Sequence, residues 1–168
     1  MSHRTALSLS TMALLCLGTV LSARPVVAQT AKDLVGTWSA ASIVNTRPDG
    51  SKADLFGANP KAMVMFDGNG RFVLDQVNPE IPKFKSNNRA QGTPEENKAV
   101  VQGSLSYHGS YSVADKVITF KIEGSSFPNW IGTDQKRPVS SFTGDELKWT
   151  NPGASVGGTA ETVWKRIK

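Results

Sequence analysis

The residues of this chain that could carry catalysis are few, and the most suggestive is a histidine with serines close to it. His108 is the only histidine outside the first 28 residues, and Ser104, Ser106, Ser110 and Asp115 lie near it in the sequence. These residue types could form a Ser-His-Asp set, in which histidine takes the proton of an attacking serine. None of these serines lies in a nucleophile elbow. We therefore expect His108 to be an exposed or pocket-rim side chain, and we assign no catalytic residue.

Metal and cofactor chemistry finds little support among the residue types. Tetrahedral zinc sites take several histidine or cysteine ligands. Outside the first 28 residues the sequence has one histidine, His108, and its one cysteine, Cys16, lies within those 28 residues. We expect no metal site and no cofactor.

Two tyrosines and a phenylalanine are the candidate ligand-binding residues. Side chains alternate between the two faces of a strand, so Tyr107 and Tyr111 share one face, and Phe120 shares a face with Ile118 and Ile122 in the next run. Tyrosine hydroxyls among apolar walls are typical of a small-molecule pocket. We predict that Tyr107, Tyr111 and Phe120 line such a pocket. The alternative is a filled core, in which the tyrosine hydroxyls reach the rim.

The elements that must position these residues are short strands. Eight runs of partly alternating apolar residues are each bounded by Gly, Pro, Asn or Asp, which indicates a meander of strands. The runs are residues 35–44, 62–66, 71–77, 107–113, 117–123, 137–142, 147–151 and 159–167. Turn residues in three connections make the neighbouring strands antiparallel. The fold class is therefore all-β, and we predict an eight-stranded antiparallel up-and-down barrel with one short helix.

The helix is predicted between the third and fourth strands. Thr93 is its N-cap, Pro94 takes the first helical position and Glu96 reaches back to the cap. We expect it to end near Gly103. A shorter turn at residues 31–34 is expected to be a 3₁₀ segment that plugs the floor of the barrel.

Two long connections carry aromatic residues, Phe84 in residues 78–92 and Trp130 in residues 124–136. Loops of this length are often lids or binding loops. We hypothesise that both guard the open mouth of the barrel, with Phe84 and Trp130 touching the ligand. In the alternative, Trp130 anchors its loop to the outer wall. The first loop also has basic residues that would either attract an anionic head group or keep the loop solvated, namely Lys83, Lys85 and Arg89.

The N-terminal segment has the order of a secretory signal. A basic start is followed by an apolar run and then by small residues that end at Ala28. The run is too short and too interrupted by Ser and Thr for a membrane span. We expect residues 1–28 to be removed, residues 29–168 to form one domain, and the protein to be periplasmic or secreted.

The net charge argues against a nucleic-acid partner. Two arginines of the signal account for part of the formal +5, which leaves +3 on residues 29–168, with basic residues scattered among acids. Nucleic-acid binding domains cluster their basic residues on one face. The sequence assigns no oligomeric state.

The two ends of the domain carry a further pattern. Gly36-Thr37-Trp38 opens the first strand and Trp164-Lys165-Arg166 lies on the last. With Asp67-Gly68-Asn69-Gly70-Arg71 in the second hairpin, the chain resembles the bacterial lipocalin-like domain family. That resemblance implies a barrel floor built by Gly36, Trp38 and Arg166, with the basic side chain lying across the indole.

Three classes of function follow from a barrel of this size. The leading one is an exported binding protein that holds a small hydrophobic or amphipathic molecule inside the barrel. The small residues Ala40, Ser42, Ala62 and Gly109 are expected to leave room for it. The second is an enzyme of isomerase or cyclase type acting on a hydrophobic substrate, and the third is an envelope interaction protein with a filled core.

Overall fold

The computed structural model describes residues 30–168. The predicted secretory signal, residues 1–28, lies outside these residues. The helices and strands follow one another in the order α1 (Ala31–Leu34), β1 (Gly36–Thr46), β2 (Lys52–Asp54), β3 (Lys61–Phe66), β4 (Arg71–Val77), α2 (Pro94–Gly103), β5 (Ser104–Ala114), β6 (Val117–Ser125), the 3₁₀ helix η1 (Pro128–Trp130), β7 (Asp134–Phe142), β8 (Glu146–Asn151) and β9 (Thr159–Arg166).

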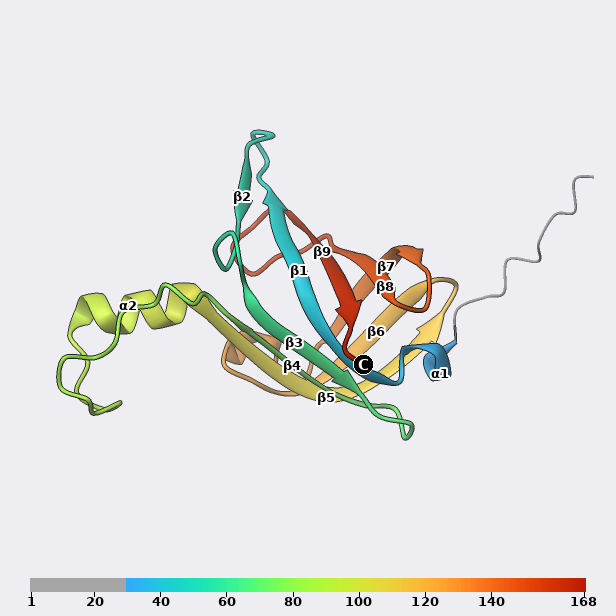
Figure 1. The fold of residues 1–168 in the computed structure, drawn as a ribbon, viewed down its shortest axis with the longest axis horizontal. Helices are drawn as coiled ribbons and strands as arrows, with labels where there is room; N and C mark the ends of the chain where they lie inside the picture. Colours follow the sequence, from blue (N-terminus) through green and yellow to red (C-terminus); the bar gives the residue numbers. More distant parts are fainter. Residues whose placement is uncertain (1–29) are drawn as a thin grey trace, which may run out of the picture.

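Eight of the strands form a closed barrel (Figure 1). β1 pairs with β3, each later strand pairs with the next as far as β9, and β9 pairs back with β1; every pairing is antiparallel. The closing pair brings Trp38 opposite Arg166 at one end and Thr46 opposite Thr159 at the other. The predicted eight-stranded up-and-down barrel is confirmed.

The strand β2 was not predicted. It pairs with the end of β1, where Val44 lies opposite Asp54 and Thr46 opposite Lys52. It is too short to show an alternating pattern, and it lies beside the end of β1 (Figure 1). β5 also starts earlier than expected, at Ser104, because the chain passes directly from α2 into the strand and the Ser104 hydroxyl donates to the Val100 carbonyl at 2.7 Å.

Local turn chemistry sets the hairpins. In the β3–β4 turn, the Asp67 carboxylate accepts hydrogen bonds from the backbone N–H of Asn69 at 2.9 Å and of Arg71 at 2.6 Å. The β5–β6 turn consists of Asp115 and Lys116, both with positive φ, at 50° and 61°. Positive φ at both central residues matches the right-handed twist of the flanking strands.

The helices begin as their capping residues predict. The Glu96 N–H donates to the Thr93 hydroxyl at 3.2 Å, and the Thr93 N–H donates to the Glu96 carboxylate at 2.9 Å. This reciprocal cap, with Pro94 at the first position, starts α2, which ends at Gly103. The first segment differs from the prediction, since Ala31–Leu34 is one α-helical turn and not a 3₁₀ segment.

The barrel is closed at the end where α1 lies. Trp38 is fully buried there, and its indole N–H donates to the Leu34 carbonyl at 2.9 Å. The Arg166 guanidinium lies over the indole ring, 4.0 Å from its centroid. Gly36 has a φ of 128°, and a Cβ atom at this position would lie 2.8 Å from Nη1 of Arg166. A residue without a side chain therefore leaves space for the arginine.

The middle of the barrel is filled by aromatic rings. Phe120 is fully buried at the centre of this layer, with ring centroids 4.4 Å from Phe72, 5.7 Å from Trp149 and 6.0 Å from Phe66. The pair with Phe66 is stacked, the pair with Phe72 is tilted and the pair with Trp149 is edge-on. Such ring pairs add stability beyond the apolar area that they bury. The filled layer separates the closed end from the other half of the interior.

Candidate functional site

The remaining half of the interior is hollow. A cavity of about 570 Å³ opens at the end of the barrel away from α1. The end of α2, the β6–β7 connection and the β8–β9 connection contribute to its lining, together with inward side chains of β1, β4, β5, β7, β8 and β9. A volume in the range of roughly 300 to 1,000 Å³ suits a small organic ligand. The sequence analysis gave a hollow interior and a filled core as alternatives. In the structure the barrel is filled in its middle and hollow at the end away from α1.

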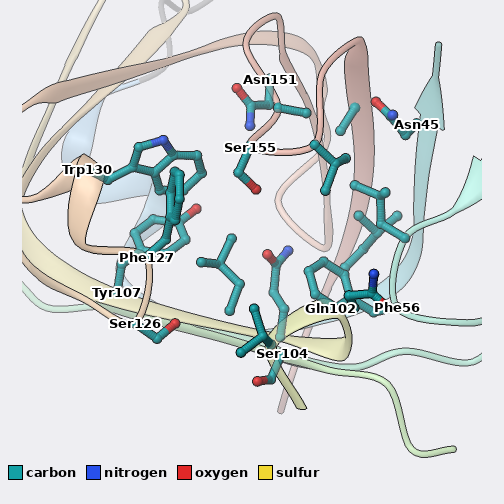
Figure 2. Close-up of a pocket in the computed structure, with 18 of the residues that line it drawn as sticks. Asn45, Phe56, Gln102, Ser104, Tyr107, Ser126, Phe127, Trp130, Asn151 and Ser155 are labelled. Carbon is teal, nitrogen blue, oxygen red and sulfur yellow. The ribbon is translucent and has the colours of Figure 1, made fainter. Parts of the chain in front are cut away.

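One wall of the cavity is aromatic. Figure 2 shows Tyr107, Phe127 and Trp130 together on this wall, with Asn45 and Phe56 on the opposite side. The Trp130 ring lies 5.3 Å from Tyr107 and 5.9 Å from Phe127, and both pairs meet edge to face. The Tyr107 hydroxyl points toward the cavity (Figure 2). This wall offers flat apolar surface and one phenolic group to a bound molecule.

Buried polar groups also line the cavity. Asn45 is 2% exposed; its side-chain N–H donates to the Gly157 carbonyl at 2.9 Å, and its Oδ1 has no partner among residues 30–168. Gln76 from β4 and Arg137 from β7 are also buried and belong to the lining. A small number of polar groups within an apolar pocket is what orients a ligand.

The structure brings together only some of the predicted ligand-binding residues. Tyr107 and Trp130 line the cavity, and Trp130 is inside the barrel mouth and not on the outer wall. Phe120 lies behind the cavity, within the aromatic layer, where its ring is 6.4 Å from that of Tyr107.

Tyr111 lies at the closed end of the barrel. Its hydroxyl is 3.0 Å from the Asp67 carbonyl and 3.1 Å from the Ala31 carbonyl. Burial, with a smaller contribution from the Asp67 carboxylate, raises the pKa of this hydroxyl above its ordinary value. Tyr111 and Tyr107 share a strand face as predicted, yet a separation of four residues along β5 places them at opposite ends of the interior.

Phe84 is held by its own loop and α2, outside the cavity lining. A Cβ atom at Gly92 would lie 2.7 Å from the Phe84 ring, and the Lys85 N–H donates to the Glu96 carboxylate at 2.9 Å. The N–H groups of Lys85 and Thr93 lower the pKa of the Glu96 carboxyl below its usual range. The loop packs on α2, and the end of α2, at Val100, Val101 and Gln102, reaches the cavity in place of Phe84. The contact of Phe84 with a ligand stays a prediction.

The room inside the barrel does not come from the small residues expected to provide it. Ala40, Ser42, Ala62 and Gly109 all lie outside the cavity lining. Gly109 is small for another reason. A Cβ atom there would lie 1.9 Å from the Lys121 carbonyl oxygen, at a register shift between β5 and β6.

His108 and Glu123 lie outside the cavity lining, whereas Ser104, one of the serines considered with His108, belongs to it. His108 is exposed on β5, and Glu123 forms an exposed ion pair with Arg71, in which Nη1 lies 2.6 Å from Oε1. This pairing lowers the pKa of the Glu123 carboxyl. Within residues 30–168, no group of three or more His, Cys, Asp or Glu side chains is placed to hold a metal ion.

Most of the cavity lining was missed by the sequence analysis, and two of the missed residues have a sequence signal that could have found them. Arg137 lies on the same face of β7 as Gln135 and Val139. A basic residue at an inward position of a strand was the signal that could have identified it. Ser155 lies in Gly153-Ala154-Ser155-Val156-Gly157, which has the letters of a nucleophile elbow. That motif needs a strand-to-helix turn, whereas these residues join the antiparallel strands β8 and β9. We therefore read Ser155 as a polar lining residue.

A closed antiparallel barrel with a cavity at one end defines a class of small-molecule-binding barrels. The chain belongs to the lipocalin-like domain family, whose model matches residues 35–167. In the described residues, no helix is both long and apolar enough to cross a membrane.

The chain is also similar to a protein whose name includes a ligand. The chain is 34% identical over 80 residues to the 4'-hydroxy-3'-methoxypropiophenone carrier protein of Aspergillus oryzae. The matched segment covers 43% of this chain and 71% of that protein. Among solved structures, a lipocalin-like protein from Bacteroides uniformis is 14% identical, with a TM-score of 0.45, over 80% of this chain and 99% of that one. A protein from Bacteroides eggerthii is also 14% identical, with a TM-score of 0.42 and the same coverage.

Proposed function

We propose that the protein is an exported carrier that holds one small, partly apolar molecule in the cavity at the open end of its barrel. The observation that carries this proposal is the cavity of about 570 Å³ with its aromatic wall. A relative that is named as a carrier protein supports the same class of function.

The chemistry of the lining supports binding over catalysis. Its described side chains are apolar, aromatic, hydroxyl, amide and guanidinium groups, whereas His108 and Glu123 lie outside. An enzyme of isomerase or cyclase type would find one tyrosine hydroxyl, that of Tyr107, and no histidine or carboxylate among the described residues of this lining.

A neutral apolar dye tests the binding proposal. N-Phenyl-1-naphthylamine becomes fluorescent when it leaves water, and we expect it to saturate the protein at one dye per chain. Leu105 lines the cavity, so Leu105→Trp should fill part of the space and weaken dye binding. Ser112→Trp adds the same side chain at an exposed position of the same strand and serves as the matched control. Unchanged binding by Leu105→Trp would contradict a ligand site inside the barrel.

Export is tested separately. The full chain, produced in a Gram-negative bacterium, should be recovered from the periplasm with Gln29 as its first residue, because the small residues before Gln29 suit signal cleavage. Mass spectrometry of the periplasmic and cytoplasmic fractions reads this out. Full-length protein confined to the cytoplasm would contradict the proposed location.

A further inference from the structure

Arg137 is a buried cation on the wall of the cavity. Its side chain is 2% exposed, and it belongs to the cavity lining. No carboxylate in residues 30–168 lies within 4.0 Å of its guanidinium. Its one hydrogen bond to a described residue runs from Nη1 to the carbonyl of the neighbouring Lys136, at 2.9 Å. A guanidinium has five N–H donors, so most of its donor capacity has no partner within the described protein.

Aromatic rings hold the guanidinium in place. Its central carbon lies 5.7 Å from the centroid of the Trp130 ring and 5.9 Å from that of Phe120. These contacts favour the cation, but they accept no hydrogen bonds from its N–H groups. Burying a charge without an ionic partner is unfavourable, so the site is incomplete as the protein alone forms it.

The rest of the lining supplies no negative charge. The charged residues of the cavity wall are Arg137 and Arg47, and both are positive. Arg47 is exposed, and its Nη1 donates to the Ser51 hydroxyl at 3.2 Å. An anion that enters the cavity therefore passes one exposed arginine and meets a buried one.

A second polar side chain packs on the same two rings as the buried cation. The Tyr107 ring contacts the same two rings as Arg137, at 5.3 Å from Trp130 and 6.4 Å from Phe120. Its hydroxyl points toward the cavity (Figure 2). A phenolic O–H donor and a guanidinium on the same aromatic wall together suit an oxygen anion.

We propose that the carried molecule is an organic oxyanion, a carboxylate or phenolate on a largely apolar body, and that Arg137 pairs with its charged oxygen. The proposal rests on the carrier function and adds the chemical class of the ligand. Planar guanidinium groups bind carboxylates through two parallel hydrogen bonds. The apolar body of the ligand then lies against the aromatic wall, and the lysines and arginine of the Phe84 loop have no part in the recognition.

A pair of probes of nearly the same shape, one anionic and one neutral, tests this inference. The probes are 4-phenylbutanoate and the neutral 4-phenylbutanamide, and their displacement of N-phenyl-1-naphthylamine gives both affinities. We expect the unaltered protein to bind the carboxylate about 10- to 100-fold more tightly than the amide, as suits a charge-assisted pair. This comparison requires no substitution, so it is independent of whether any variant folds.

Four variants identify the cation responsible. Arg137→Met should abolish the preference for the carboxylate while keeping affinity for the amide, and Arg137→Lys should keep part of the preference. Lys136→Met removes the same charge from the adjacent, exposed position of β7 and should change neither affinity. Arg47→Met should leave most of the preference, because Arg47 is exposed to solvent.

Each contrary outcome has its own meaning. Equal affinity of the unaltered protein for the two probes would overturn the oxyanion proposal and leave the carrier function standing. A preference retained by Arg137→Met would overturn the role of Arg137. Binding of the neutral dye with no binding of the carboxylate would also overturn the oxyanion proposal, whereas failure to bind the dye or either probe would overturn both proposals.

Discussion

Trp38 and Arg166 are opposite one another in the pairing of β1 with β9, and the guanidinium lies 4.0 Å above the indole centroid. The same guanidinium donates hydrogen bonds to three carbonyl groups, from Nε to Gly144 at 2.6 Å and from its Nη atoms to Val35 and Asp33 at 2.7 Å each. The contact that covers the floor of the barrel thus also ties together the first strand, the last strand and the chain before β1.

Replacing Arg166 tests this closure. Arg166→Met should lower the free energy of unfolding by about 2 to 3 kcal/mol, since it removes a cation–π contact and leaves carbonyl groups short of a donor. Lys165→Met is the matched control, because Lys165 lies on the outer face of the same strand and pairs there with Glu146. Urea unfolding of both variants gives the comparison, and equal losses would argue against a special role for Arg166.

The second prediction concerns the close approach of β5 and β6. Gly109→Ala should destabilise the domain by at least about 1 to 3 kcal/mol, because its Cβ would meet the Lys121 carbonyl oxygen and the backbone must shift. Gly68→Ala, in the β3–β4 turn, meets nothing within 4 Å and should be tolerated. Thermal unfolding followed by circular dichroism measures both, and a wild-type midpoint for Gly109→Ala would show that the strands can separate at no cost.

The third prediction is a pH dependence of the Phe84 loop and α2. Because the folded pKa of Glu96 is lowered, its contribution to stability is present above the unfolded pKa of about 4.3 and is lost as the pH falls through the folded pKa. Glu96→Gln should therefore be less stable than the unaltered protein at pH 7, and the difference should shrink at acidic pH.

Melting curves recorded from pH 7 to acidic pH test the Glu96 prediction. Glu95→Gln removes the same charge from the same turn of α2, where Glu95 is exposed, and it should change the acid response little. If the gap between Glu96→Gln and the unaltered protein stayed constant with pH, ionisation of Glu96 would not be what ties the loop to α2.

The fourth prediction concerns the mouth of the cavity. Val101 at the end of α2 is 78% exposed, Val156 in the β8–β9 connection is 67% exposed, and both belong to the cavity lining. If a bound molecule covers them, the double change Val101→Ser and Val156→Ser should weaken dye binding roughly fivefold or more, while stability changes little. Val73→Ser, at an exposed position of β4 outside that lining, is the control. Equal dye affinity of the two variants would place the ligand deeper than the rim.

Much of the fold could be predicted from neighbouring residues. Alternation set which side chains of β5 point inward, and Asp67, Asp115 and Lys116 formed the tight turns that make adjacent strands antiparallel. Thr93, Pro94 and Glu96 started the helix where expected. These signals act over a few residues, through backbone dihedral preferences and hydrogen bonds between near neighbours, so the sequence alone carries them.

The site was decided by the closed barrel. Inward orientation is common to Tyr107 and Tyr111, but only the stagger of the strands and the position of α1 put one at the cavity and the other at the floor. The burial of Arg137 depends on Phe120 and Trp130, which come from β6 and η1. Whether an interior position is filled or hollow depends on the summed volumes of side chains from many strands, and these meet only when the first strand pairs with the last.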